Sequence, residues 1–120
     1  QNSNFRQVLY TAKDCQLVLM SLLPGEEIGL ETHKEGDQFF RFEKGEGKVV
    51  IDETEYRVSD GDAVIVPMGA RHNVINTSQT EALKLYTLYA PPHHKDGIVR
   101  VTRAEAETQG AEFDGVTTEA

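Results

Sequence analysis

The hydrophobic residues of this chain occur in short runs, separated by polar segments that contain glycine, proline, asparagine or aspartate. The runs are rich in branched and aromatic side chains, which are typical of β-strands. Strands are expected at residues 5–11, 16–23, 28–33, 37–43, 48–51, 55–58, 63–66, 72–76 and 82–90. About nine short strands with a turn signal roughly every eight to twelve residues are typical of an antiparallel sandwich or barrel.

Helical periodicity is found only after Val101, in the segment 102–108. Thr102 is a good N-cap, and Glu105 three residues later completes a capping-box pattern. The last residues are polar and contain glycine, so we expect a loosely held tail in which Phe113 is the side chain available for docking. The pattern therefore predicts an all-β fold in a single domain, residues 1–120, with a barrel core at about 16–90 and a C-terminal extension at 91–120 that forms a short helix or tail.

The charge of the chain limits its partners. The 120 residues carry a net charge of −8, with 38% hydrophobic and 27% charged residues, a composition typical of a soluble globular domain. An acidic surface repels phosphate backbones and anionic lipid, so we expect neither a nucleic acid nor a membrane partner. An anionic small molecule stays possible because a bound metal supplies local positive charge.

Cysteine content and hydropathy indicate the compartment. The single cysteine, Cys15, cannot form an internal disulfide, which favours a reducing, cytoplasmic location. Cys15 precedes the apolar run 17–20, so we expect it to be a buried strand thiol rather than a nucleophile. No apolar run approaches the roughly 20 residues that a membrane-spanning helix needs.

Side chains able to bind a metal gather in two stretches, 25–45 and 61–76. Glu31 and His33 are two residues apart on an expected strand and therefore share a face. Gln38 follows a tight turn onto the next strand, which brings it close to His33, and His72 comes from a strand elsewhere in the sheet. Two imidazoles and a carboxylate are familiar ligands of first-row divalent ions, to which Gln38 adds a neutral oxygen.

Four protein ligands leave one or two positions for water or substrate, which suits catalysis better than a closed structural site. The alternative is that these are isolated, solvated side chains, since exposed histidine, glutamate and glutamine are common.

Both stretches resemble the two sequence motifs of the cupin superfamily. The first has Gly25, five residues, Glu31-Thr32-His33, four residues, Gln38, six residues and Gly45; the second has Gly61, five residues, Pro67-Met68-Gly69, two residues, His72, three residues and Asn76. The resemblance implies a small single-domain cupin, a jelly-roll β-barrel with a metal inside its mouth. The second motif matches at every fixed position, whereas the first departs at two, because the family's first histidine is Glu31 here and its glutamate is Gln38.

Carried over residue by residue, the resemblance implies that Glu31, His33, Gln38 and His72 bind one divalent metal. Both replacements still offer an oxygen donor and keep one negative charge among the ligands. Manganese, iron, nickel and zinc all suit nitrogen and oxygen ligands, so the identity of the ion stays open.

Other side chains are candidates for the pocket. Phe40 and Phe42 share the face of Gln38 and should form barrel core or pocket wall, and Tyr89 is assigned to the pocket. His94, in the loop after the last long strand, is a candidate general acid or base if that loop crosses the barrel mouth. The alternative is an exposed exit loop.

Two classes of function fit these residues. The first is a metal-dependent enzyme that isomerises, epimerises or eliminates on a small, oxygen-rich, sugar- or uronate-like molecule, with an iron-dependent dioxygenase on the same ligands as a variant. The second is a non-catalytic module that binds a small ligand. In either case we expect a homodimer, formed through the outward-facing Phe39 and one face of Ala82–Ala90.

Overall fold

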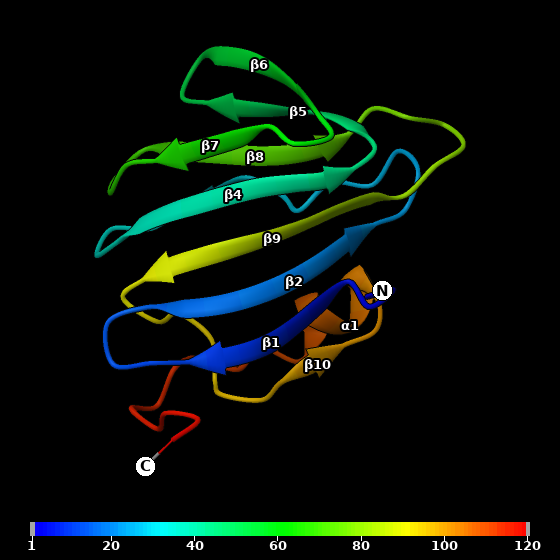
Figure 1. Ribbon diagram of the computed structural model, residues 1–120. Helices are drawn as coiled ribbons and strands as arrows, with labels where there is room; N and C mark the ends of the chain where they lie inside the picture. Colours follow the sequence, from blue (N-terminus) through cyan, green and yellow to red (C-terminus); the bar gives the residue numbers. More distant parts are fainter. Residues whose placement is uncertain (1, 120) are drawn as a thin grey trace.

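The computed structural model describes residues 2–119 as two antiparallel sheets that enclose a core, with one short helix at the side (Figure 1). The six-stranded sheet has the order β10-β1-β2-β9-β4-β7, and the four-stranded sheet has the order β3-β8-β5-β6. The elements are β1 Arg6–Thr11, β2 Gln16–Leu22, β3 Glu31–Thr32, β4 Asp37–Lys44, β5 Glu46–Ile51, β6 Thr54–Ser59, β7 Ala63–Val66, β8 Arg71–Asn76, β9 Leu83–Ala90, β10 Val99–Arg100 and α1 Arg103–Thr108. The expected all-β jelly-roll fold with a short C-terminal helix is confirmed.

Alternation along β4 and β9 decides what faces the core. On β4, Gln38, Phe40 and Phe42 are buried, while Phe39 and Arg41 face outward and are half-buried. On β9, Tyr89 is buried and Tyr86 is not. The core joins these residues to side chains of the other sheet, and its fully buried members include Met20, Leu22, Val49, Val74 and Leu83. Strand parity thus places the predicted pocket residues inside the barrel.

Two local expectations were wrong, and one short strand was missed. The strand expected at 28–33 is regular only in β3, because Gly29 adopts a φ of 111° that interrupts the extended chain. The short strand β10 was not foreseen. Cys15 is exposed, because it lies in the turn before β2, where its carbonyl accepts the Ala12 amide at 2.9 Å, rather than inside the strand.

The C-terminal segment is held more firmly than expected. Helix α1 begins as predicted, with the Glu105 amide donating to Thr102 Oγ1 at 3.1 Å. Beyond the helix, Phe113 N donates to His93 O at 3.0 Å. Thr118 N donates to Thr11 O at 2.9 Å, and Thr11 N donates to Thr118 Oγ1 at 2.8 Å. The prediction of a loosely held tail was therefore wrong, since this segment is bonded to the loop after β9 and to the end of β1.

Candidate metal centre

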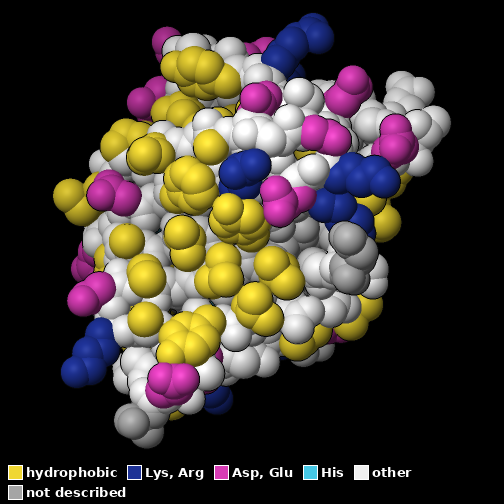
Figure 2. Space-filling model, in the orientation of Figure 1, with side chains coloured by type: hydrophobic (Ala, Val, Ile, Leu, Met, Phe, Trp, Pro, Cys, Tyr) yellow, Lys and Arg dark blue, Asp and Glu magenta, His cyan; other side chains and the backbone are white. Residues whose placement is uncertain are grey.

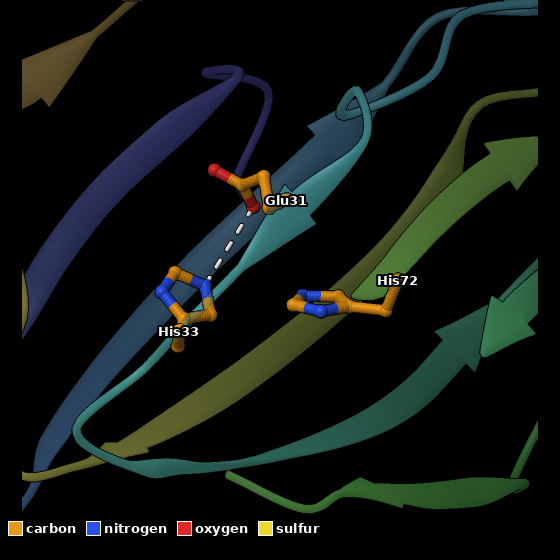
Figure 3. A group of neighbouring side chains, drawn as sticks. All are labelled: Glu31, His33 and His72. Carbon is orange, nitrogen blue, oxygen red and sulfur yellow. Dashed lines mark ion pairs between the residues drawn. The ribbon is translucent and has the colours of Figure 1, made fainter. Parts of the chain in front are cut away.

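Three side chains from two strand regions converge inside the barrel: Glu31 on β3, His33 just after it and His72 on β8 (Figure 3). One potential ligand atom from each lies within 4.8 Å of the other two. Glu31 Oε1 is 3.8 Å from His33 Nε2, and the two imidazole centroids are 5.2 Å apart. The antiparallel register sets Glu31 opposite His72, which explains how residues 41 positions apart meet.

The turn after His33 is fixed on two sides. His33 O accepts the Gly69 amide at 2.9 Å, and Asp37 Oδ1 accepts the Met68 amide at 2.8 Å, so the two motif stretches are bonded directly to each other. Gly36 packs against the end of β9, where an added Cβ would lie 2.5 Å from Ala90 O. A glycine is required there because a side chain would collide with backbone.

The fourth predicted ligand, Gln38, lies on β4 with 2% of its surface exposed. Its Nε2 donates to Thr87 Oγ1 at 2.9 Å, while its Oε1 is buried without a hydrogen-bond partner. His33 Nε2 and His72 Nε2 are also buried and lack partners. Buried polar atoms without partners are rare and costly, and a cation bound by all three predicted ligands would satisfy them together. The residues therefore fit a divalent ion.

Burial controls the charge of the cluster. It lowers the pKa of His33 to about 4, with the charges of His93, His72 and Arg6 acting in the same direction. Burial also lowers the pKa of His72. The pKa of the Glu31 carboxyl is raised by burial, an effect that the positive charge of Arg6 opposes. At neutral pH both imidazoles are consequently neutral, the form that binds metals.

The four histidines of the metal-free protein are expected to titrate below the usual value of 6.5, His33 at about 4 and His94 at about 2. As the pH falls below 6.5, these histidines bind protons in the unfolded chain before they do so in the folded protein. The free energy of unfolding is therefore highest above pH 6.5 and decreases as the pH falls from 6.5 through the folded-state pKa values. An NMR titration of the ring protons measures this. A His33 or His94 midpoint at or above 6.5 would contradict the burial described here.

The loop after β9 brings a residue to the site that the sequence did not single out. The ring of His93 lies 4.5 Å from that of His33, edge to face, and stacks on Tyr89 at 5.3 Å. The predicted acid or base, His94, lies behind Tyr89, with its Nε2 3.2 Å from the Tyr89 hydroxyl and 8% of its surface exposed. Of this pair, His93 is thus the ring nearer to a candidate ligand, which it meets edge to face. In the sequence the two histidines are adjacent, and no local signal says which of them faces the site.

The predicted pocket residues surround the cluster at different depths. Tyr89 meets His33 edge to face at 5.5 Å, and Phe40 lies 6.0 Å from the His72 ring. Phe42 stacks on Phe40 at 6.3 Å and lies one step deeper in the core. Phe40 and Tyr89 therefore form apolar walls of the site.

A cavity of about 330 Å³ opens beside the cluster. It is lined by the turn 32–37, Tyr89, Pro91, Pro92 and His93. Its volume is that of a small-molecule site. A larger hollow, of about 430 Å³, lies along β5 and β6, but its lining includes neither a histidine nor any of the four predicted ligands. The smaller cavity is therefore the one that adjoins the candidate ligands, through His33.

Comparison with known proteins identifies the family. Residues 18–89, more than half of the chain, match a family model described as the cupin domain. The chain belongs to the cupin family. Both motif stretches that carry the candidate ligands, 25–45 and 61–76, lie entirely inside this match.

Relatives of this cupin are found in bacteria and in a virus. It is 48% identical to the uncharacterised protein YrkC of Bacillus subtilis (strain 168) over 112 residues. This alignment covers 88% of this chain and 60% of YrkC. It is 38% identical over 114 residues to the uncharacterised protein L612 of Acanthamoeba polyphaga mimivirus, covering 92% of this chain and 71% of L612. The cupin thus spans less than two thirds of YrkC.

A solved crystal structure has the same fold as this cupin. The crystal structure of BH2720 from Bacillus halodurans superposes with a TM-score of 0.88 at 42% sequence identity, covering 90% of this chain and 86% of that one. Within residues 2–119 of this cupin, no helix has the length and apolar character needed to cross a membrane.

Proposed function

We propose that this cupin is a metal-dependent enzyme that isomerises, epimerises or eliminates on a small, oxygen-rich, sugar- or uronate-like molecule. The observation that carries the proposal is the set of three buried, unpartnered polar atoms, on His33, Gln38 and His72, beside a cavity of about 330 Å³. A closed structural site would not need an adjoining cavity of this size.

In this proposal Glu31, His33, Gln38 and His72 bind one divalent ion. The ion, when bound, supplies Lewis-acid polarisation of a carbonyl or hydroxyl oxygen. Gln38 is held for this role by its bond to Thr87, which leaves Oε1 free. The ligand set does not select among manganese, iron, nickel and zinc.

Proton transfer is assigned to the loop after β9. His93 lines the cavity, and because burial lowers its pKa it is neutral at pH 7 and can accept a proton from a bound molecule. Tyr89 and His94 stand behind it as a bonded pair, and burial raises the pKa of Tyr89, so its hydroxyl keeps its proton. We therefore give the acid–base role to His93 and a positioning role to His94.

Elemental analysis of protein purified without added metal is the first test. Near-stoichiometric manganese, nickel or zinc would lead to assays on sugar acids and sugar phosphates. A wild-type protein that is empty and cannot be loaded would overturn the proposal in favour of a non-catalytic, small-ligand-binding module.

An iron-dependent dioxygenase is the second candidate. Glu31, His33 and His72 form a two-histidine, one-carboxylate set, a ligand combination typical of non-haem iron oxygenases. Iron in the elemental analysis, followed by ligand-dependent oxygen uptake, would favour this reaction over isomerisation.

A homodimer is proposed on the outer face of the six-stranded sheet, where apolar side chains gather (Figure 2). The register sets Leu88 between Leu17 on β2 and Phe39 on β4, and Phe39 pairs with Ile65 on β7. These four side chains form an apolar row across the sheet, which is a suitable interface for a second copy.

The single exposed thiol, Cys15, is compatible with a reducing compartment, and we propose the cytoplasm.

Light scattering is expected to give twice the chain mass of 13.4 kDa for the wild type and one chain mass for Leu88→Asp. A carboxylate in the middle of the row would be buried unpaired in the dimer. Leu23→Asp, at a leucine that is 62% exposed and lies outside the row, serves as the matched control and should stay dimeric. A wild-type mass near 13.4 kDa would refute the dimer.

A further inference from the structure

Arg6, the first residue of β1, is an arginine with only 9% of its surface exposed. Its Nε is buried without a hydrogen-bond partner, and no ion pair of its guanidinium is found within residues 2–119. The guanidinium carbon lies over the Phe5 ring, 5.2 Å from its centroid. Glu31 is close enough for its carboxyl to be affected by the charge of Arg6, but the two form no ion pair, so the guanidinium can still take an anion at contact distance.

Beside Arg6 is a cavity of about 140 Å³, enclosed by β1, the loop after β9 and the segment around α1. Its charged and polar lining includes Arg6, Arg100, His93, His94 and Glu112. Arg100 is fixed at the wall, donating from Nε to Gln109 O at 2.9 Å and from Nη1 to Val99 O at 3.1 Å. The cavity thus has Arg6 and His94 as its buried members and Arg100 bonded in place, with exposed residues such as His93 and Glu112 at its rim.

The charge in this lining is positive, in a chain whose net charge is −8. Arg6 and Arg100 are cations, and burial lowers the pKa values of His93 and His94, so both rings are neutral at pH 7. Glu112 is the acid of the lining, but it is exposed and lies outside ion-pair distance of Arg6. The Arg6 guanidinium thus keeps its donors available for a ligand.

We propose that this cavity binds an oxyanion, a carboxylate or phosphate group, through the Arg6 guanidinium. At about 30 Å³ per water molecule, the space corresponds to four or five waters, enough for such a group. The planar fork of an arginine matches two oxygens of either anion at once. His93 lines both this cavity and the one beside the metal ligands, so the anion is either a separate ion or one end of a molecule that passes His93.

Calorimetric titration with inorganic phosphate and with acetate tests the site, first on metal-free protein and then on metal-loaded protein. The proposal does not depend on a metal, so binding by the metal-free protein separates its outcome from that of the proposed enzyme. Wild type is expected to bind at least one of the two anions, and Arg6→Gln to bind it at least about 10-fold more weakly, with partial recovery in Arg6→Lys.

Arg41→Gln is the control, because Arg41 also has a buried Nε without a hydrogen bond, but this Nε forms an ion pair with Glu43 at 3.8 Å and lies on the outer face of β4. It should bind like the wild type. No measurable binding of either anion by the wild type, or equal affinity in wild type and Arg6→Gln, would overturn the proposal.

An NMR titration of the wild type guards against a variant that fails to fold. Phosphate should shift the amides of Ile98, Ala106 and Ala111, which line the cavity. Shifts confined to the hollow along β5 and β6 would overturn the assignment. Galacturonate then identifies the source of the anion. If galacturonate competes with phosphate and also shifts residues 34–36, one molecule spans both cavities. If galacturonate and phosphate bind at the same time, the anion in this cavity is a separate ion.

Discussion

His72→Ala is expected to weaken the binding of a divalent ion at least about 100-fold. The substitution removes one of two imidazoles whose Nε2 atoms are buried and unpartnered, and no other side chain of β8 is part of the cluster. Changing a residue that merely supports a ligand typically costs about 10- to 100-fold in metal affinity, so losing a ligand should cost more. Metal content after purification and a competition titration with a coloured chelator measure the change.

His94→Ala is the matched control for that experiment. It removes another buried imidazole, 8% exposed against 2% for His72, but one that bonds to Tyr89 and lies outside the cluster. It should keep its metal, and circular dichroism should show both variants folded. Equal loss of metal in the two variants would mean that general destabilisation, and not a lost ligand, explains the result.

Gln16→Leu is expected to lower the free energy of unfolding by about 2–4 kcal/mol, although the two side chains have similar volumes. Gln16 is fully buried on β2. Its Nε2 donates to Thr11 Oγ1 at 2.9 Å and to His94 O at 2.7 Å, and its Oε1 accepts the amides of His93 and His94 at 3.2 and 3.0 Å. A leucine would leave these backbone groups buried without partners, which costs more than losing the bonds alone.

The same change should disturb the site, because this glutamine fixes the backbone of the loop that carries His93. Chemical denaturation measures the stability, and the ring-proton shifts of His93 and His33 report the displacement. Gln7→Leu, on the half-buried side of β1, is the matched control and should cost little. A Gln16→Leu protein as stable as the Gln7→Leu protein would show that the loop does not depend on these bonds.

The sequence predicted most of the fold because strand alternation and turn signals are local. The run 37–43 alternates in register with burial in β4, so the inward positions of Gln38, Phe40 and Phe42 followed from parity alone. The cluster of Glu31, His33 and His72 followed from the resemblance of two motifs, since no local rule pairs β3 with β8.

What the sequence could not predict depends on contacts between distant segments. In the sequence, nothing distinguishes Arg6 from any other arginine on a strand. It is buried because the C-terminal segment covers β1, and a register shift between Val8 and Tyr10 changes the parity along that strand. The choice between His93 and His94 likewise depends on Gln16, 77 and 78 positions away, which bonds the loop in one orientation.

The fold holds the candidate metal ligands unevenly. His72 and Gln38 belong to interior strands, whereas Glu31 and His33 lie on or next to β3, a two-residue strand at the edge of its sheet. The two residues of β3 pair only with His72 and Arg71, and beyond them the segment is held by the bond from the Gly69 amide to His33 O, so it can open without unfolding the barrel. An ion held here should therefore exchange with solvent at the rate at which the edge opens, many times faster than the protein unfolds. The lifetime of the bound ion and the lifetime of the fold are in this way separate properties of the chain.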